Sequence, residues 1–173
     1  MGASNIDSAP TYTIHRTLKD AMSVMGRSYA VQDASGAATL TVSQEMHLGS
    51  DKWSVRDAQG SEVATITRGP LHVHPTFDFV GSDGTSVTIT KANFSPLHET
   101  WRIEGLTSGT IDIHGSITNH EFELVHADGN VVARASRKWA SITEGYGLQV
   151  TAGLPLVVAV AAAVALDETE NTH

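Results

Sequence analysis

Apolar and aromatic positions recur along this chain at a nearly constant interval. Each unit begins with an aromatic residue, has an apolar residue two positions later, and reaches glycine seven or eight positions after the aromatic. The first five aromatics stand 24, 24, 24 and 21 residues apart, and a sixth follows 24 residues later. A fixed interval of this kind indicates a repeated supersecondary unit. The units are Tyr29–Gly36, Trp53–Gly60, Phe77–Gly84, Trp101–Gly109, Phe122–Gly129 and Tyr146–Gly153.

A second stretch of alternating β-branched and polar residues follows the glycine in each of the first five units. Two such stretches on either side of an Asp/Ser/Gly cluster are typical of a β-hairpin with one buried face. Aspartate and glycine are expected at these turns because both tolerate a positive φ. The second stretches are Thr39–Val42, Glu62–Ile66, Ser86–Thr90, Thr110–Ile113 and Asn130–Ala135.

The hairpins predict the fold class. Five of them account for ten strands, and Tyr12–His15 and Tyr146–Val150 supply two more. Consecutive hairpins form an antiparallel meander, which closes into a barrel when its first and last strands pair. The sequence therefore predicts a mainly β fold, an antiparallel barrel of about twelve strands.

The sixth unit departs from the pattern because an apolar run, Leu154–Leu166, replaces its second strand. As a helix, these 13 residues span about 20 Å, less than the ~30 Å hydrocarbon core of a bilayer. Pro155 suits the first turn of such a helix, and Asp167 follows the last apolar residue. A helix that is apolar on every side has to be enclosed, and a barrel of about twelve strands has room for one. We expect the helix inside the barrel; insertion into lipid is the competing interpretation.

Chain length and net charge indicate the domain organisation and exclude some classes of partner. The 173 residues are expected to form one domain, with an N-terminal segment over 1–27, the barrel over 28–168 and an acidic tail over 169–173. Within the first segment, Thr17–Gly26 is compatible with a short helix or a loop. The net charge of −8 argues against nucleic acid as a partner, and the absence of cysteine excludes disulfides. The first residues lack the features of a secretory signal, so a cytoplasmic location is expected.

Short motifs in the second half of the chain carry a resemblance to a known family. They are Gly115, Asn119-His120, Ser136–Trp139, Tyr146-Gly147 and the apolar run that ends in acidic residues at 168. With these motifs the chain resembles the LURP-one-related family over residues 28–168. The resemblance implies a twelve-stranded barrel around a hydrophobic C-terminal helix, a fold related to the tubby C-terminal domain and to phospholipid scramblases. It also implies a non-enzymatic binding or scaffold module, with a phospholipid head group or a protein partner as ligand.

Structural roles are expected for several large side chains, and His120 is expected to donate to the backbone at the start of its strand. The residues given structural roles are Trp53, Trp101, His120, Trp139 and Tyr146.

Motifs that would indicate catalysis are missing. The sequence contains no nucleophile elbow, no His-Glu-x-x-His and no glycine-rich phosphate loop, so neither an enzyme nor a cofactor is expected. An enzyme whose site is assembled from distant loops is a less favoured alternative. His72 and His74 alternate along a strand, and His98 occupies the position equivalent to His74. Surface histidines are the preferred interpretation, and no metal site is expected.

Basic residues provide a more specific hypothesis about a binding site than the histidines do. In a meander all hairpin turns lie at one end of the barrel, and all connections between hairpins lie at the other. Arg68, Lys91, Arg137 and Lys138 fall at the connection end, which predicts a site for a lipid phosphate or another anion, peripheral to a membrane. The competing interpretation is that nearby carboxylates neutralise them in pairs. Those carboxylates are Asp51, Glu99, Glu121 and Glu144.

The main functional alternative is a protein-interaction module without a lipid ligand. It would use either an exposed strand edge or the acidic end of the barrel that carries the turns. The acidic residues near the turns are Asp33, Asp57, Glu62, Asp83, Glu104 and Asp128, with Arg56 as the opposing charge.

Overall fold

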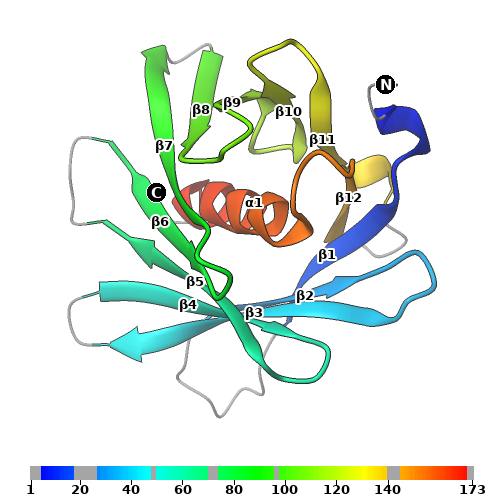
Figure 1. Cartoon of the computed structure of the whole chain (residues 1–173), viewed down its shortest axis with the longest axis vertical. Coiled ribbons are helices and arrows are strands. Elements are labelled where there is room, and N and C mark those ends of the chain that lie inside the picture. The colour runs from blue at the N-terminus through cyan, green and yellow to red at the C-terminus, as the bar shows by residue number, and fades with distance from the viewer. Residues whose placement is uncertain are drawn as a thin grey trace.

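The computed structural model describes residues 5–17, 27–47, 50–69, 74–95, 98–139 and 145–170. Within them the chain forms twelve antiparallel strands that close into a barrel, and a helix lies inside the ring of strands (Figure 1). The mainly β barrel predicted from the sequence is confirmed. The strands are β1 (Thr11–Thr17), β2 (Ser28–Gln32), β3 (Ala38–His47), β4 (Ser50–Asp57), β5 (Glu62–Arg68), β6 (Thr76–Gly81), β7 (Ser86–Ser95), β8 (His98–Glu104), β9 (Ile111–Ser116), β10 (Glu121–His126), β11 (Val131–Ser136) and β12 (Gly145–Val150).

Three helical segments complete the described part of the fold. Two are single 3₁₀ turns, η1 (Ile6–Ser8) and η2 (Arg137–Trp139), and the third is the α-helix α1 (Leu156–Glu170). Residues 18–26, which hold most of the segment expected to be a short helix or a loop, lie outside the described residues.

Closure depends on β1, which pairs with β2 on one side and with β12 on the other. Ile14 is opposite Val31 in one pair and opposite Tyr146 in the other. Each of the twelve described strands thus has two neighbours, although β3 and β7 extend beyond the residues that pair with β2 and β6. The closed ring gives the strand-edge version of the protein-interaction alternative only these strand ends, and that version stays a prediction.

The six repeated aromatics all belong to the core. Each lies near the start of an even-numbered strand, β2 to β12, so the repeat brings them to the same end of the barrel interior. Cross-strand neighbours share a face, and Trp53 is opposite Ile66 while Phe77 is opposite Ile89. The rings of Trp53 and Phe77 lie 6.0 Å apart. Trp101 is also buried, at 1% exposed. The repeat therefore reflects one interior layer of large side chains.

The turns correct one detail of the sequence interpretation. Gly36 has a φ of 84°, and glycine occupies the positive-φ position in the other hairpin turns too. Asp33 does not; its carboxylate instead accepts hydrogen bonds from the backbone N–H groups of Ser35 and Ala37. Hydrogen bonds from the Ser35 hydroxyl and from these amides lower the pKa of Asp33. Aspartate recurs in the turns because it satisfies the turn amides, as in an Asx turn.

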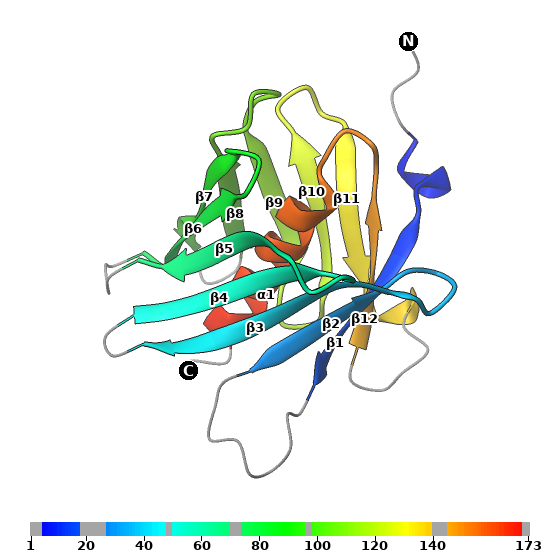
Figure 2. The same cartoon turned by 60° about the horizontal axis from the view of Figure 1, so that its bottom comes forward.

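The interior helix α1 begins two residues later and ends four residues later than the apolar run Leu154–Leu166. Every residue from Val158 to Leu166 is at most 1% exposed, because the strands surround the helix on all sides (Figures 1 and 2). Alanine at five of these nine positions keeps the helix thin enough to fit within the ring of inward side chains. The protein's own wall, not lipid, encloses this apolar segment.

Among the described residues, no helix combines the length and the apolar character needed to cross a bilayer.

Candidate functional site

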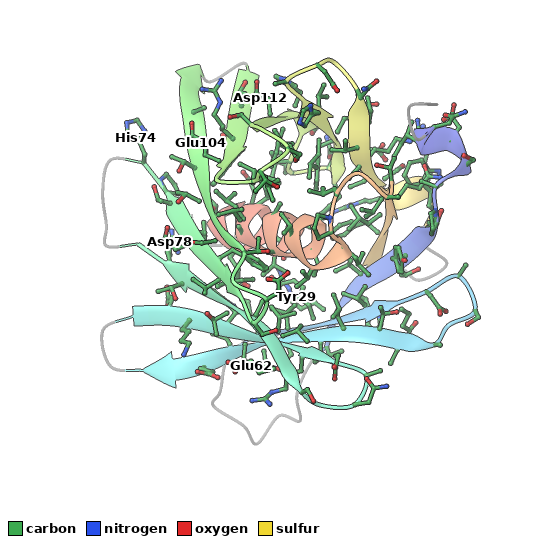
Figure 3. The ribbon with its side chains drawn as sticks, in the orientation of Figure 1. Tyr29, Glu62, His74, Asp78, Glu104 and Asp112 are labelled. Atoms are coloured by element: carbon green, nitrogen blue, oxygen red, sulfur yellow. The ribbon has the colours of Figure 1, made fainter. Side chains whose placement is uncertain are left out.

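The candidate site lies at the end of the barrel that carries the connections between hairpins, which we call the loop-side mouth. Helix α1 enters from the opposite end, where the Leu154 N–H donates to the Thr151 carbonyl, and its last turn reaches this mouth. Polar residues there come from the end of β1, the start of β2, the residues before β10, and η2. Tyr29 extends from the barrel wall toward the helix (Figure 3).

Asp167, in the last turn of α1, receives hydrogen bonds from three side chains. An Arg16 guanidinium nitrogen and the Tyr29 hydroxyl each lie 2.7 Å from its Oδ2, and His120 Nε2 lies 3.0 Å from Oδ1. The side chain is only 11% exposed. Burial alone would raise the pKa of Asp167, but hydrogen bonds from His120, Arg16 and Tyr29 outweigh it and hold that pKa well below its usual value. The mouth therefore contains a buried, ionised carboxylate.

Two more carboxylates of α1 have partners on the wall. Glu168 Oε1 lies 2.6 Å from the Tyr29 hydroxyl, and its Oε2 lies 3.3 Å from Arg27 Nη1. Glu170 accepts a hydrogen bond of 2.9 Å from the Thr118 hydroxyl. Burial and the neighbouring carboxylates raise the pKa of Tyr29, so its hydroxyl stays protonated as a donor. The acidic end of the helix is thus fastened to β1, β2 and the β9–β10 connection.

The sequence patterns do not predict this cluster, although one signal for it is present. Arg16 is two residues from the inward-facing Ile14 on the same strand, so both side chains belong to the inner face. A cation facing an apolar interior needs an anion nearby, and the interior helix ends in Asp167 and Glu168.

His120 connects the helix end to η2. Its ring stacks on Tyr146 at 4.4 Å, and its φ of 54° is the only positive value among non-glycine residues in the described ranges. Arg137 Nε donates to His120 Nδ1 at 3.2 Å, and His120 Nε2 lies 3.0 Å from Asp167 Oδ1. The ring therefore bonds to side chains, not to the backbone as expected; only its main-chain N–H donates to backbone, at Ile117.

The four cations predicted to form one site are divided between two parts of the mouth. Arg68 ends β5, Lys91 is on β7, and Arg137 and Lys138 begin η2 directly after β11. In the closed ring β5 is six strands from β11 in either direction, so Arg68 is diametrically opposite the η2 cations. The expectation of one cationic cluster is wrong because the closed ring separates residues that a linear meander places at a common end.

Arg68 and Lys91 are paired with carboxylates. Arg68 Nη1 lies 3.9 Å from Asp51 Oδ2, and its guanidinium lies 5.7 Å from the centre of the Phe77 ring. Lys91 Nζ lies 2.6 Å from Glu99 Oε1. Pairwise neutralisation, the competing interpretation of the basic residues, thus describes this half of the mouth.

The two cations of η2 differ from Arg68 and Lys91 in their surroundings. Arg137 and Lys138 are exposed, and neither forms an ion pair with any residue in the described ranges. Glu121, expected to neutralise this group, instead accepts hydrogen bonds from the Ser136 hydroxyl and the Arg137 N–H. Trp139, the next residue, is 37% exposed. A basic pair beside an exposed indole is the most accessible cationic feature of the described mouth. Glu144, the other carboxylate expected here, lies outside the described residues.

An open groove of about 540 Å³ runs between η2 and the outer faces of β9, β10 and β11. Its polar lining includes both signs of charge. The residues that matter for its chemistry are His114, Glu121, Glu123, Arg134, Lys138 and Trp139.

The histidines do not form a metal site in the described ranges, where no three potential ligand side chains come together. His74 is exposed, and His72 lies outside the described residues.

Gly147 holds η2 against the barrel, because a Cβ at this position would collide with the Trp139 side chain. Gly147→Ala should therefore displace η2 and cost about 1–3 kcal/mol of unfolding free energy, the usual range for overpacking. Chemical denaturation would measure the loss, and tryptophan emission would report the altered Trp139. Gly153→Ala is the matched control, since its Cβ would meet its nearest neighbour at 3.4 Å, an ordinary contact. Equal stability losses in both variants would contradict this role of Gly147.

The chain is similar to a known protein family and to a solved structure. A family model described as LURP-one-related matches residues 11–167. The chain belongs to the LURP-one-related family. A solved structure of a protein from Arabidopsis thaliana has a TM-score of 0.65 and 12% identity, covering 96% of this chain and 97% of that one. At that identity the likeness shows the fold alone. No curated protein sequence matches the chain.

The family motifs of this LURP-one-related chain meet in space. His120 stacks on Tyr146, Arg137 bonds to His120, and Gly147 provides the space for Trp139. Family membership and the closed barrel together favour a non-enzymatic binding module.

Proposed function

We propose that this LURP-one-related protein attaches to the cytoplasmic surface of a membrane by binding the phosphate of a phospholipid head group at η2. One observation carries the proposal. Arg137 and Lys138 are adjacent, exposed and without an ion pair in the described ranges, and the exposed indole of Trp139 follows them. The module has no catalytic step; it brings the barrel to a lipid surface.

The chemistry of η2 suits a phosphate group at an interface. Arginine and lysine form charge-assisted hydrogen bonds to phosphate, and each is worth about 1 kcal/mol near an anionic lipid surface. Tryptophan favours the head-group region because it combines an apolar ring with one polar N–H. Among the described residues, only the Nε of Arg137 donates from the guanidinium, to His120, and the two terminal nitrogens are left for a ligand.

Arg68 and Lys91 are proposed as minor contributors. A phosphate at either cation would compete with Asp51 or Glu99. The acidic turns give less support to a protein-interaction role, because aspartates such as Asp33 accept hydrogen bonds from their own turns.

The double variant Arg137→Gln/Lys138→Gln tests the proposal. At about 1 kcal/mol per cation, it should bind vesicles about 30-fold more weakly than the unchanged protein. Co-sedimentation with phosphatidylcholine–phosphatidylethanolamine vesicles containing a minor fraction of phosphatidylserine, at two salt concentrations, measures this. Arg68→Gln/Lys91→Gln removes the same charge and should weaken binding less than about threefold. No vesicle binding by the unchanged protein, or equal losses in both variants, would refute the assignment to η2.

A further inference from the structure

The groove beside η2 presents charges of both signs to a ligand. Glu121 and Glu123 are two positions apart on β10, so both side chains extend from the same outer face of the sheet. Lys138 and Trp139 line the groove from η2. Its volume of about 540 Å³ is within the range of small-molecule sites.

Several of these groups are available for a ligand. In the described part of the chain, neither the Glu123 carboxylate nor the Lys138 ammonium has a hydrogen bond or an ion pair. Within the described ranges, Glu121 accepts only at Oε1, from the Ser136 hydroxyl and the Arg137 N–H, so Oε2 has no partner there. The groove thus offers one cation and two carboxylates.

Arg134, the other cation of the groove, already has partners within the protein. It bonds to Asp7 at 2.7 Å and to Gln149 at 3.0 Å, and its guanidinium lies 5.1 Å from the centre of the Trp139 ring. The guanidinium neutralised by Asp7 is not a free phosphate ligand. Because this guanidinium already lies over the indole ring, the carboxylates of the groove, and not Trp139, are the groups left for a ligand cation.

The net charge of the whole protein favours some lipid head groups over others. At −8, the chain is repelled by a strongly anionic surface, so a head group with negative charge alone meets long-range repulsion and the groove carboxylates. A zwitterionic group avoids both penalties.

We propose that the groove binds a phosphoalkylammonium group, phosphoethanolamine or phosphocholine, with its phosphate at Lys138 and its ammonium at the Glu123 carboxylate. The inference rests on the proposed role of η2 and specifies its ligand class. The same chemistry occurs in phosphatidylethanolamine or phosphatidylcholine and in the free phosphoesters, so the experiment needs an arm for each source.

The first arm titrates the full chain with free phosphoethanolamine, phosphocholine, inorganic phosphate and choline. Trp53 and Trp101 are each 1% exposed, so the change in quencher-accessible tryptophan emission reports Trp139. Both phosphoesters should bind at least tenfold more tightly than phosphate or choline alone. Glu123→Gln and Lys138→Gln should each weaken phosphoester binding about tenfold, equivalent to about 1.4 kcal/mol. Glu104→Gln, an exposed carboxylate on β8 (Figure 3), is the control and should bind normally.

The second arm compares vesicles of phosphatidylcholine and phosphatidylethanolamine with vesicles rich in phosphatidylserine. Preference for the neutral vesicles, reduced by Glu123→Gln, supports the inference. Binding of phosphoethanolamine without binding of any vesicle supports the groove and refutes membrane attachment. Vesicle binding that requires phosphatidylserine and is unchanged in Glu123→Gln overturns the zwitterionic site and leaves the proposed function standing. Phosphate binding as tightly as phosphoethanolamine, or an equal loss in Glu104→Gln, also overturns it.

Discussion

Ala162→Asp should yield no folded barrel. Ala162 is fully buried within α1, with the barrel wall on every side, so a carboxylate there has no water and no space. An unpaired buried charge costs several kcal/mol even after the structure relaxes, which is comparable to the ~5–15 kcal/mol stability of an ordinary domain. Recovery in the soluble fraction and the near-ultraviolet circular dichroism signal measure the outcome.

Two matched substitutions separate charge from other effects. Ala162→Ser adds one small polar group that can bond within the helix, so it should fold with a loss of about 1 kcal/mol. Ala58→Asp introduces the same carboxylate at an exposed turn and should be nearly neutral. A soluble, cooperatively folded Ala162→Asp protein would show that α1 leaves the barrel readily, against the enclosed arrangement.

Asp167→Asn should lower the free energy of unfolding by about 3 kcal/mol. The change keeps the shape of the side chain but removes the charge that Arg16, Tyr29 and His120 surround. The value is at the lower end of the range for breaking a buried ion pair, because Arg16 is 34% exposed and water can solvate it. The melting temperature should fall by roughly 10 °C for a chain of this size. Glu170→Gln, at an exposed hydrogen bond to Thr118, should cost less than about 1 kcal/mol.

The same substitution should change how stability depends on pH. The pKa of Asp167 is lower in the folded protein than the ~3.9 of an unfolded aspartate, so its contribution is fully present above about pH 4. It is lost as the pH falls toward the folded pKa. Acid denaturation curves should therefore converge for the two proteins below about pH 4. A constant stability difference down to the acid transition would show that the charge of Asp167 is not the stabilising group.

Local pattern was sufficient for the elements of the barrel. Tyr29, Trp53 and Phe77 repeat every 24 residues because each occupies the same place in a hairpin, so counting them predicted the strands. The apolar run Leu154–Leu166 similarly predicted an interior helix, because no exposed position could accept it.

The same patterns failed for the site, for a reason visible in two residue pairs. Arg16 and Asp167 are 151 positions apart and meet only because the helix end reaches the mouth beside β1. Arg68 and Arg137 stand at equivalent ends of their strands, yet the ring places them on opposite sides. Neither relation depends on local periodicity.

By itself, the sequence determined the hairpin repeat, the interior helix and the end of the barrel at which its basic residues fall, because all three follow from which side chains avoid water. Only the tertiary structure decided which charges meet. Closure of the ring determines how far apart the strands lie around the mouth. Helix α1 is long enough to reach the mouth, where Asp167 pairs with Arg16 and Glu168 pairs with Arg27. Arg137 and Lys138 were left without such a partner among the described residues. Whether a side chain is buried follows from its own residue type and its place in the local pattern. Which charges pair depends on how distant segments of the chain pack together.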